Sequence, residues 1–402
     1  MTRPGSDGPF ATMNPLFANL PTTIFETMSA RARATGAINL GQGFPDSGWP
    51  NDVVAAAAEA LTKGSNQYPP MAGTPELRRA IADHYRAHQG VDLDWQAEVT
   101  VTSGATEALA AALFALITPG DEVVLFQPLY DAYLPLVRRA GGVARLVPLQ
   151  PPHWQFSDAD LAAAFSPRTR VVLINNPLNP SASTFDRASL ERLARFAVAH
   201  DAIVISDEVW EHVVFDGADH CSILAVPALR DRAVKIGSGG KIFALTGWKV
   251  GWLCAAPALT QGLAKAHQFL TFTTPPNLQA GIAHGLGKDA GWFTAMRASF
   301  ERSRDRLVGG LAAAGYAMLP SAGTYFVSID LAASGIAAPD TAVADRLIEA
   351  GVATIPVSAF YAEHPVTTTL RLCFAKQDAI LDGAIDRMAE ARPGLVRARR
   401  IL

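Results

Sequence analysis

A lysine in a glycine-rich stretch is the side chain of this sequence best suited to covalent chemistry. Lys241 lies in GSGGKIFALTGWKVGW, residues 237–252, directly after an apolar strand predicted over residues 233–237. Consecutive glycines let the backbone approach a ligand closely, and a lysine amine can form an imine with an aldehyde. Because lysines after glycine turns are mostly solvated surface residues, the neighbouring groups must decide between the two interpretations.

The neighbouring groups favour a phosphorylated aldehyde. Asp207 ends an apolar run, and Ser103-Gly104-Ala105-Thr106 joins a predicted strand to a helix, where free N–H groups attract an anion. Ser238 and Lys249 can add a hydroxyl and a positive charge to the same anion. An acid that keeps a pyridine nitrogen protonated completes the set, so we predict pyridoxal phosphate as the cofactor. Taken singly, the SGAT turn could be ordinary capping and Asp207 a helix cap.

Three more residues are candidates for holding the cofactor ring and the substrate. Asn179 lies in NNPLNP, where prolines fix an extended turn and leave its amide free to donate to a ring oxygen, although asparagine is also common in such turns. Tyr130 offers a flat face for stacking on the ring, with core packing as the alternative. Arg371 lies inside an apolar strand and suits a substrate carboxylate, with an internal salt bridge as the alternative.

The composition excludes several classes of protein. The chain has 402 residues, of which 49% are hydrophobic and 18% charged, and its net charge is -3 without a basic block. This is typical of a globular enzyme and gives no support for a nucleic-acid or membrane partner. The three cysteines are widely spaced and form no CxxC motif, so we expect neither disulfides nor a metal site, and we predict the cytoplasm as the compartment. No signal peptide is visible.

The elements that must position these residues alternate along the chain. One helix is predicted between the strand over 99–102 and residue 117, and another over 186–200. The strands are predicted over 99–102, 122–127, 143–149, 170–175, 202–207, 233–237 and 250–255. Such alternation predicts an α/β fold with a mostly parallel sheet covered by helices. Ligands of such sheets bind beyond the carboxyl ends of the strands, and the residues suspected in this region lie at those ends.

The two ends of the chain are predicted to form a smaller α+β domain. Residues 1–20 are interpreted as a loose arm and 24–35 as a helix, while a long helix from about residue 289 precedes strands over 324–329 and 368–374. We therefore divide the chain into an N-terminal arm with part of the small domain (1–45), a large cofactor-binding domain (46–288) and a C-terminal small domain (289–402).

Several motifs occur in the order found in class I/II aminotransferases of the aspartate aminotransferase superfamily, which this chain resembles over nearly its whole length. They are LGQGFPD (40–46), NQYPP (66–70), SGATEA (103–108), SDEVWEH (206–212), GKIFALTGWKVGW (240–252) and RLCFAK (371–376). The closer resemblance is to the branch of kynurenine/glutamine transaminases, methionine aminotransferases and succinyldiaminopimelate aminotransferases. It implies the fold of pyridoxal-phosphate-dependent transferases, with a seven-stranded sheet in the large domain.

The resemblance also implies roles for individual residues. Lys241 would hold the cofactor as an internal aldimine and move protons, Asp207 would pair with the pyridinium, and Asn179 would bond the phenolic oxygen. Tyr130 would stack on the ring. The groups expected to hold the phosphate are Ala105, Thr106, Ser238 and Lys249.

The remaining implied contacts involve the substrate and a second subunit. Gly43, Arg371 and Asn179 would meet the substrate. Tyr68 would reach the phosphate from the other subunit of a homodimer, and Phe272 would line the pocket across the dimer interface.

Two positions depart from the family pattern. Trp210 stands where relatives have tyrosine in DEVY, and an indole offers only one N–H donor on a larger ring than the phenol. We predict that the pKa of the internal aldimine is higher than in a tyrosine-bearing relative. Pro180-Ser181-Ala182 replaces the usual proline and glycine-containing turn after Asn179, which leaves the preferred substrate open.

The predicted reaction is a ping-pong transamination in which an L-amino acid leaves as a 2-oxo acid and a second 2-oxo acid accepts the amino group. One alternative is a carbon–sulfur β-lyase acting on cysteine conjugates with the same scaffold. Another is a regulator that binds the cofactor without turnover, for which the N-terminal arm leaves no room for a DNA-binding domain. Aromatic or methionine-like donors are favoured. The side chains expected to select the donor are Phe44, Trp49, Phe272, Phe360 and Tyr361.

Overall fold

A seven-stranded sheet forms the centre of the larger part of the molecule. The computed structural model describes residues 14–46 and 48–397. In spatial order the strands are β2 (Val99–Thr102), β8 (Gly251–Ala255), β7 (Ala233–Ser238), β6 (Ile203–Asp207), β5 (Thr169–Asn175), β3 (Glu122–Gln127) and β4 (Val143–Pro148). Only β8 runs antiparallel to its neighbours. The prediction of a mostly parallel sheet is therefore confirmed.

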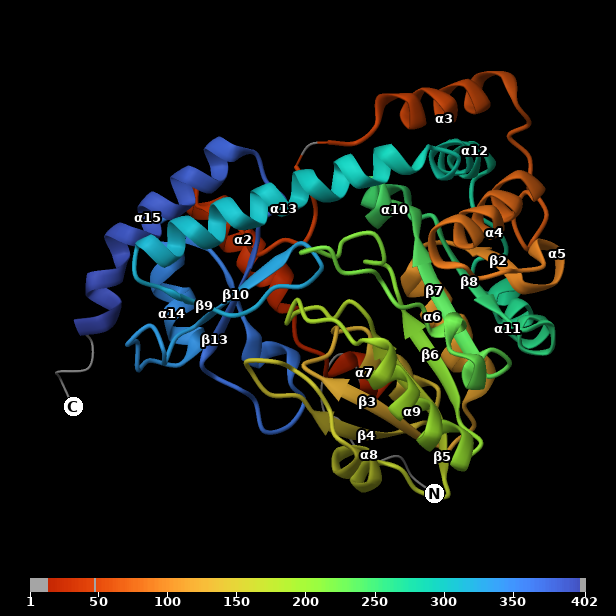
Figure 1. The fold of residues 1–402 in the computed structure, drawn as a ribbon, viewed down its shortest axis with the longest axis horizontal. Coiled ribbons are helices and arrows are strands. Elements are labelled where there is room, and N and C mark those ends of the chain that lie inside the picture. Colours follow the sequence, from red (N-terminus) through yellow and green to blue (C-terminus); the bar gives the residue numbers. More distant parts are fainter. Residues whose placement is uncertain (1–13, 47, 398–402) are drawn as a thin grey trace.

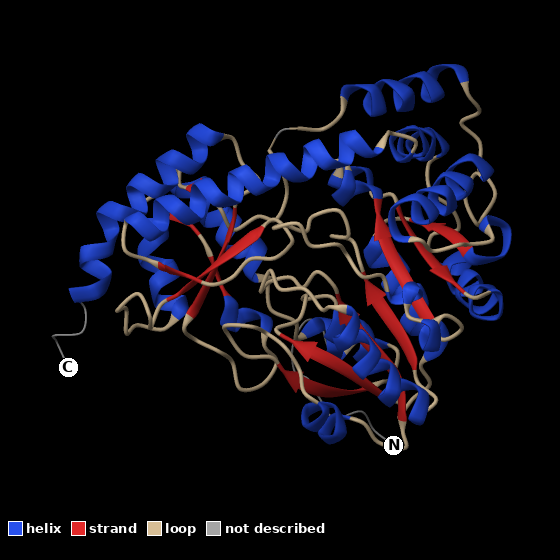
Figure 2. Cartoon of the chain, viewed as in Figure 1, coloured by secondary structure: helices blue, strands red, loops and turns tan. Residues whose placement is uncertain are grey.

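Helices cover both faces of this sheet (Figure 2). Successive residues of a strand point to opposite faces, and in β6 Ile203 and Ile205 enter one buried core while Val204 enters the other. Burial on both faces explains why the sequences of these strands are continuous apolar runs. The helices of this part are α3 (Asn51–Lys63), α4 (Pro75–Gln89), α5 (Trp95–Glu98), α6 (Ala105–Leu116), α7 (Tyr133–Arg139), α8 (Asp158–Ala164), α9 (Arg187–Ala199), α10 (Gly239–Ile242), α11 (Pro257–Leu270) and α12 (Pro276–Leu286).

A second, smaller assembly lies beside the first (Figure 1). Its four-stranded sheet has the order β12 (Ile355–Pro356), β13 (Thr369–Cys373), β10 (Phe326–Asp330) and β9 (Ala317–Met318), and β1 (Ile38–Asn39) pairs with β11 (Val352–Ala353). The long helix α13 runs from the larger part to α15 (Figure 1). The helices here are α2 (Ile24–Thr35), α13 (Ala290–Ala313), α14 (Asp340–Glu349) and α15 (Asp378–Arg397). The residue limits assigned to the domains stay a prediction.

Local backbone geometry explains where the sequence boundaries were wrong. The strand predicted from residue 324 begins at Phe326, because Thr324 has a left-handed backbone with φ of 69°. The strand predicted from residue 250 begins at Gly251, after left-handed Lys249. Residues 239–242 form the short helix α10 where a turn was predicted. Of the predicted arm, residues 1–13 lie outside the described residues, and α1 covers Pro15–Ala18.

A buried histidine pair joins α4 to the segment that follows β6. The Nε2 atoms of His84 and His212 lie 2.7 Å apart, and both rings are buried. Burial, reinforced by the charges of His88 and Lys235, lowers the pKa of His84 to about 3 and that of His212 well below its usual value. At least one ring must therefore stay neutral in the folded protein.

This pair predicts a loss of stability in mild acid. An unfolded histidine takes up a proton near pH 6.5, whereas folded His84 does not until about pH 3, so protons favour the unfolded state between these values. We expect the free energy of unfolding to fall by up to about 1.4 kcal/mol per pH unit from this residue. Urea unfolding should show a weaker acid dependence for His84→Gln, while the exposed control His153→Gln should match the parent. Identical slopes in all three proteins would contradict the prediction.

Candidate active site

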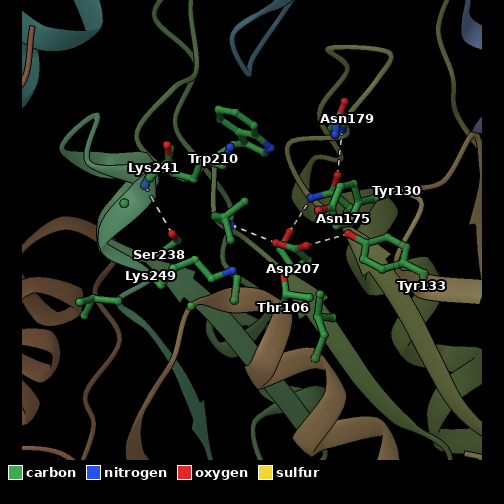
Figure 3. A pocket seen from close by; sticks show the side chains of 17 residues that line it. Thr106, Tyr130, Tyr133, Asn175, Asn179, Asp207, Trp210, Ser238, Lys241 and Lys249 are labelled. Carbon is green, nitrogen blue, oxygen red and sulfur yellow. Dashed lines mark hydrogen bonds between the residues drawn. The ribbon is translucent and has the colours of Figure 1, made fainter. Parts of the chain in front are cut away.

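A cavity of about 240 Å³ opens where β5, β6 and β7 end (Figure 3). The start of β8 lies at the same edge because that strand runs in the opposite direction. The side chains predicted to bind the cofactor meet here: Ala105, Thr106, Tyr130, Asn179, Asp207, Trp210, Ser238, Lys241 and Lys249 all line the cavity. Segments far apart in the sequence therefore line one cavity.

Lys241 projects into this cavity from α10. Ser238 begins that helix, and its Oγ accepts a hydrogen bond from the Lys241 N–H at 3.4 Å. The Lys241 Nζ donates to the carbonyl oxygen of Gly43 at 3.2 Å and lies 4.5 Å from the centre of the Trp210 ring. Burial lowers the pKa of Lys241 to about 8, so roughly a tenth of the amine is unprotonated at pH 7, far more than for an ordinary lysine. An unprotonated amine is the form that attacks an aldehyde.

Asp207 provides a fixed acid at the floor of the cavity. Its Oδ2 accepts a hydrogen bond from the Tyr133 hydroxyl at 2.7 Å, and its Oδ1 accepts from the Val209 N–H at 3.3 Å. Burial raises the pKa of this carboxyl, although the hydrogen bonds and the nearby Lys241 charge oppose the shift. A cationic N–H would stabilise the ionised form in this position.

Two residues of this site were missed from the sequence. Tyr133 buttresses Asp207, and Asn175 donates to the Asp207 carbonyl while its Oδ1 accepts from the Asn179 N–H at 2.8 Å. A signal for Tyr133 existed, because it lies three residues after Tyr130 at the start of a helix and a buried acid needs a donor. No signal distinguished Asn175 from its neighbour Asn176.

The start of α6 forms an anion-binding corner. Its first residues, Ala105 and Thr106, have N–H groups without intrahelical acceptors, and no side chain caps the helix. Lys249 lies so close that a Cβ on Gly104 would come within 3.3 Å of its Nζ. Gly104 also has a left-handed φ of 80°. Glycine at this position therefore lets a positive charge and free N–H groups share one small space.

A second cavity of about 270 Å³ adjoins the first and shares Lys241 with it. Arg371, 1% exposed, lines this cavity and donates to Asn179 Oδ1 at 2.8 Å and to the Gly41 carbonyl at 2.6 Å. Its Nε has no partner within the described chain, and no ion pair is formed there with a described carboxylate. Burial lowers the pKa of Arg371 to about 9. The internal salt bridge considered from the sequence is therefore absent among the described residues.

Gly43 allows the loop before α3 to approach this second cavity. A Cβ on Gly43 would lie 2.5 Å from Cζ of Phe326, which itself packs 3.9 Å from the Arg371 guanidinium. The carbonyl of Gly43 faces Lys241 as described above. Only glycine fits between Phe326 and the lysine.

Tyr68 and Phe272 are not brought to the site within this chain. Tyr68 is 83% exposed and borders a different groove, where its ring meets that of Phe272 edge-on at 5.5 Å. Phe269, Leu270 and Phe272 are also exposed. No helix among the described residues is both long and apolar enough to cross a membrane.

The comparisons with known proteins agree on one family. The model of "Aminotransferase class I and II" matches residues 35–388. A probable N-succinyldiaminopimelate aminotransferase of Mycobacterium tuberculosis is 42% identical over 379 residues, 92% of this chain and 96% of that protein. A methionine aminotransferase of Escherichia coli is 42% identical over 94% of this chain and 100% of that protein. A kynurenine–oxoglutarate transaminase of Rattus norvegicus is 33% identical over 87% of this chain and 91% of its own.

Solved structures give the same result. The N-succinyldiaminopimelate aminotransferase of M. tuberculosis superposes with a TM-score of 0.91 at 41% identity, covering 94% of this chain and 100% of the other. The E. coli methionine aminotransferase superposes with a TM-score of 0.91 at 40% identity, covering 94% and 99%. These values extend over both parts of the fold.

Proposed function

The chain belongs to the class I and II aminotransferases, enzymes that use pyridoxal phosphate, and we propose that Lys241, Asp207 and Arg371 carry its transamination. The observation that carries this proposal is the position of Lys241 between two cavities. One offers an acid and an anion-binding corner, and the other offers a buried, unpaired arginine.

The donor groups present fit this cofactor. The α6 corner with Thr106, Ser238 and Lys249 would hold the phosphate, Asp207 would face the pyridine nitrogen, and Tyr130 would cover the ring. Asn179 accepts from Arg371 through Oδ1, which leaves its NH₂ as the donor for the phenolic oxygen. When bound, the cofactor supplies an aldehyde that takes up the amino group and a ring that withdraws electrons from the substrate's α-carbon.

Each side chain around the two cavities has its own role in the proposed reaction. Arg371 binds the substrate carboxylate, which is a planar partner for its fork of N–H groups. The Lys241 Nζ would remove the α-proton of the substrate and hold it for the return transfer, for which a pKa of about 8 is well matched. Tyr133 keeps Asp207 ionised and correctly oriented. Trp210 and Phe326 exclude water from the space around Lys241.

We propose an apolar amino donor, either aromatic or methionine-like, and a 2-oxo acid acceptor. The second cavity is lined by rings of Phe25, Phe44 and Phe326, and its two cations, Lys241 and Arg371, already have roles. Among the described lining residues no further cation is available for a second carboxylate. The E. coli relative is a methionine aminotransferase, but the M. tuberculosis relative of the same identity is a probable N-succinyldiaminopimelate aminotransferase, so the lining of the cavity carries this choice.

The test is the visible spectrum of the enzyme loaded with pyridoxal phosphate, recorded with single amino acids. Methionine and aromatic amino acids should bleach the yellow band and yield their 2-oxo acids. Bleaching only by succinylated diamino acids would refute the donor class but keep the reaction. Pyruvate and ammonia released from a cysteine conjugate without an acceptor would instead indicate β-lyase activity.

We also propose a homodimer in which Tyr68 completes the partner's phosphate site. The exposed Tyr68 and Phe272 surface supports this, because such apolar area is usually covered. Mixing inactive Tyr68→Ala and Lys241→Ala chains should restore activity, since a mixed dimer contains one site with both native residues. Activity that stays at the level of the separate variants would contradict the proposal.

We also propose that the enzyme is cytoplasmic, because the thiols of Cys221, Cys254 and Cys373 are free.

Trp210 predicts a shifted titration of the loaded enzyme. Its ring lies under Lys241 Nζ, and its N–H lies on the side facing Asn179 (Figure 3). An indole attracts a cation more strongly than a phenol and donates less readily to a phenolate, so both effects favour the protonated lysine nitrogen. We expect Trp210→Tyr to lower the pH midpoint of the visible absorbance. The control Trp95→Tyr, at a residue that lines neither cavity, should leave it unchanged, and equal midpoints in all three proteins would contradict the prediction.

A further inference from the structure

A buried histidine connects the anion-binding corner to the segment of the chain that carries Tyr68. His267 lies on α11 and is fully buried. Its Nδ1 is 3.0 Å from both carboxylate oxygens of Glu107, in the first turn of α6, and its Nε2 is 3.1 Å from the carbonyl oxygen of Met71. Met71 follows Tyr68 by three residues. One imidazole ring therefore joins the anion-binding corner to the Tyr68 segment.

The hydrogen-bond partners favour a ring that carries both protons, because each ring nitrogen faces an oxygen acceptor. A backbone carbonyl only accepts hydrogen bonds, and the Glu107 carboxylate already accepts at Oε2 from the Ser103 N–H at 3.1 Å. Both Glu107 oxygens lie 3.0 Å from Nδ1 while Oε2 also accepts from Ser103, an arrangement that suits a carboxylate accepting a hydrogen bond from a protonated ring. Burial opposes a charge on His267, but the hydrogen bond and charge of Glu107 outweigh it and raise the pKa of the ring. The ring is an imidazolium paired with a carboxylate.

This ion pair neutralises a carboxylate that would otherwise repel an anion bound at the anion-binding corner. The Glu107 side chain closes the loop by accepting from Ser103, which orients the N–H groups of Ala105 and Thr106. A carboxylate one residue beyond Thr106 nevertheless opposes a phosphate dianion. The His267 charge cancels that of Glu107 while leaving its hydrogen bond to Ser103 intact.

We propose that His267 is a positioning residue for the cofactor phosphate, acting through Glu107 and the Met71 carbonyl. The inference rests on the proposed assignment of residues 103–106 to the phosphate. It assigns His267 no contact with substrate or cofactor.

The test compares two ligands that differ only in the phosphate. Binding of pyridoxal 5′-phosphate and of pyridoxal to the cofactor-free enzyme is measured by quenching of tryptophan fluorescence. We expect His267→Gln to weaken pyridoxal 5′-phosphate binding by at least about tenfold, because an uncompensated charge remains near the phosphate, and to leave pyridoxal binding unchanged. The double variant with Glu107→Gln should recover most of the loss. His284→Gln, which breaks the exposed pair with Asp52, should change neither ligand.

The outcomes separate this inference from the proposed function. Equal losses for both ligands with a lower melting temperature, or an unchanged preference for the phosphate, would overturn the role of His267. A parent enzyme that does not prefer the phosphorylated ligand would refute the assignment of residues 103–106 instead. If His267→Gln does not fold, Glu107→Gln alone decides: it keeps an acceptor for Ser103 and removes the charge, so weaker phosphate binding would overturn the proposal.

Discussion

Replacing Lys241 with alanine is expected to reduce transamination by at least about 10⁴-fold, because a single amine both anchors the cofactor and moves the α-proton. No other described amine lines both cavities. The structure supplies Lys249 only to the first cavity, at its anion-binding corner, so it cannot replace Lys241 at the substrate.

The fold should survive this change. Lys241 is a partly buried cation whose Nζ has one hydrogen bond, to a backbone carbonyl, and burial already opposes its charge. We therefore expect Lys241→Ala to melt no lower than the parent without cofactor, and to regain part of its rate when a small primary amine is added. Lys241→Arg keeps the charge without a nucleophilic amine and serves as the matched control. Substantial activity in either variant without added amine would contradict the assigned role.

The large sheet could be predicted from the sequence because its physical signature is local. Each strand is buried on both faces and is therefore a short apolar run, as in Ile203–Asp207, and the functional residues follow such runs. The helix Ile24–Thr35 was predicted to the residue because Thr23 caps its start and Gly36 ends it. Boundaries were wrong where a non-glycine residue has a left-handed backbone, as at Thr324, which sequence alone does not reveal.

The contacts of the site could be predicted only in part. Lys249 was suspected as an anion ligand, but it precedes a strand instead of following one. It reaches the site only because β8 runs antiparallel, and strand direction is a property of the whole sheet. Tyr133 and His267 act through hydrogen bonds to residues 74 and 160 positions away. No local pattern encodes such pairs, so they required the structure.

Replacing Arg371 is expected to change substrate affinity and the free energy of unfolding in different ways. A buried guanidinium without a carboxylate partner is costly for the folded protein, and here only two of its nitrogens have acceptors, Asn179 and Gly41, while Nε has none. The substrate carboxylate is the partner that would complete its bonding. Arg371→Met fills a similar volume among the rings of Phe25, Phe326 and Phe360 without a charge.

We therefore expect Arg371→Met to keep or increase the free energy of unfolding of the substrate-free enzyme while raising KM for the amino donor by at least about a hundredfold, as loss of a buried charge partner predicts. Arg371→Lys should keep part of the affinity, because a lysine retains the charge but not the fork. Chemical denaturation and steady-state kinetics measured on the same preparations decide the matter. If stability and affinity fell together, Arg371 would be a structural residue, because a group that awaits its partner stabilises only the complex.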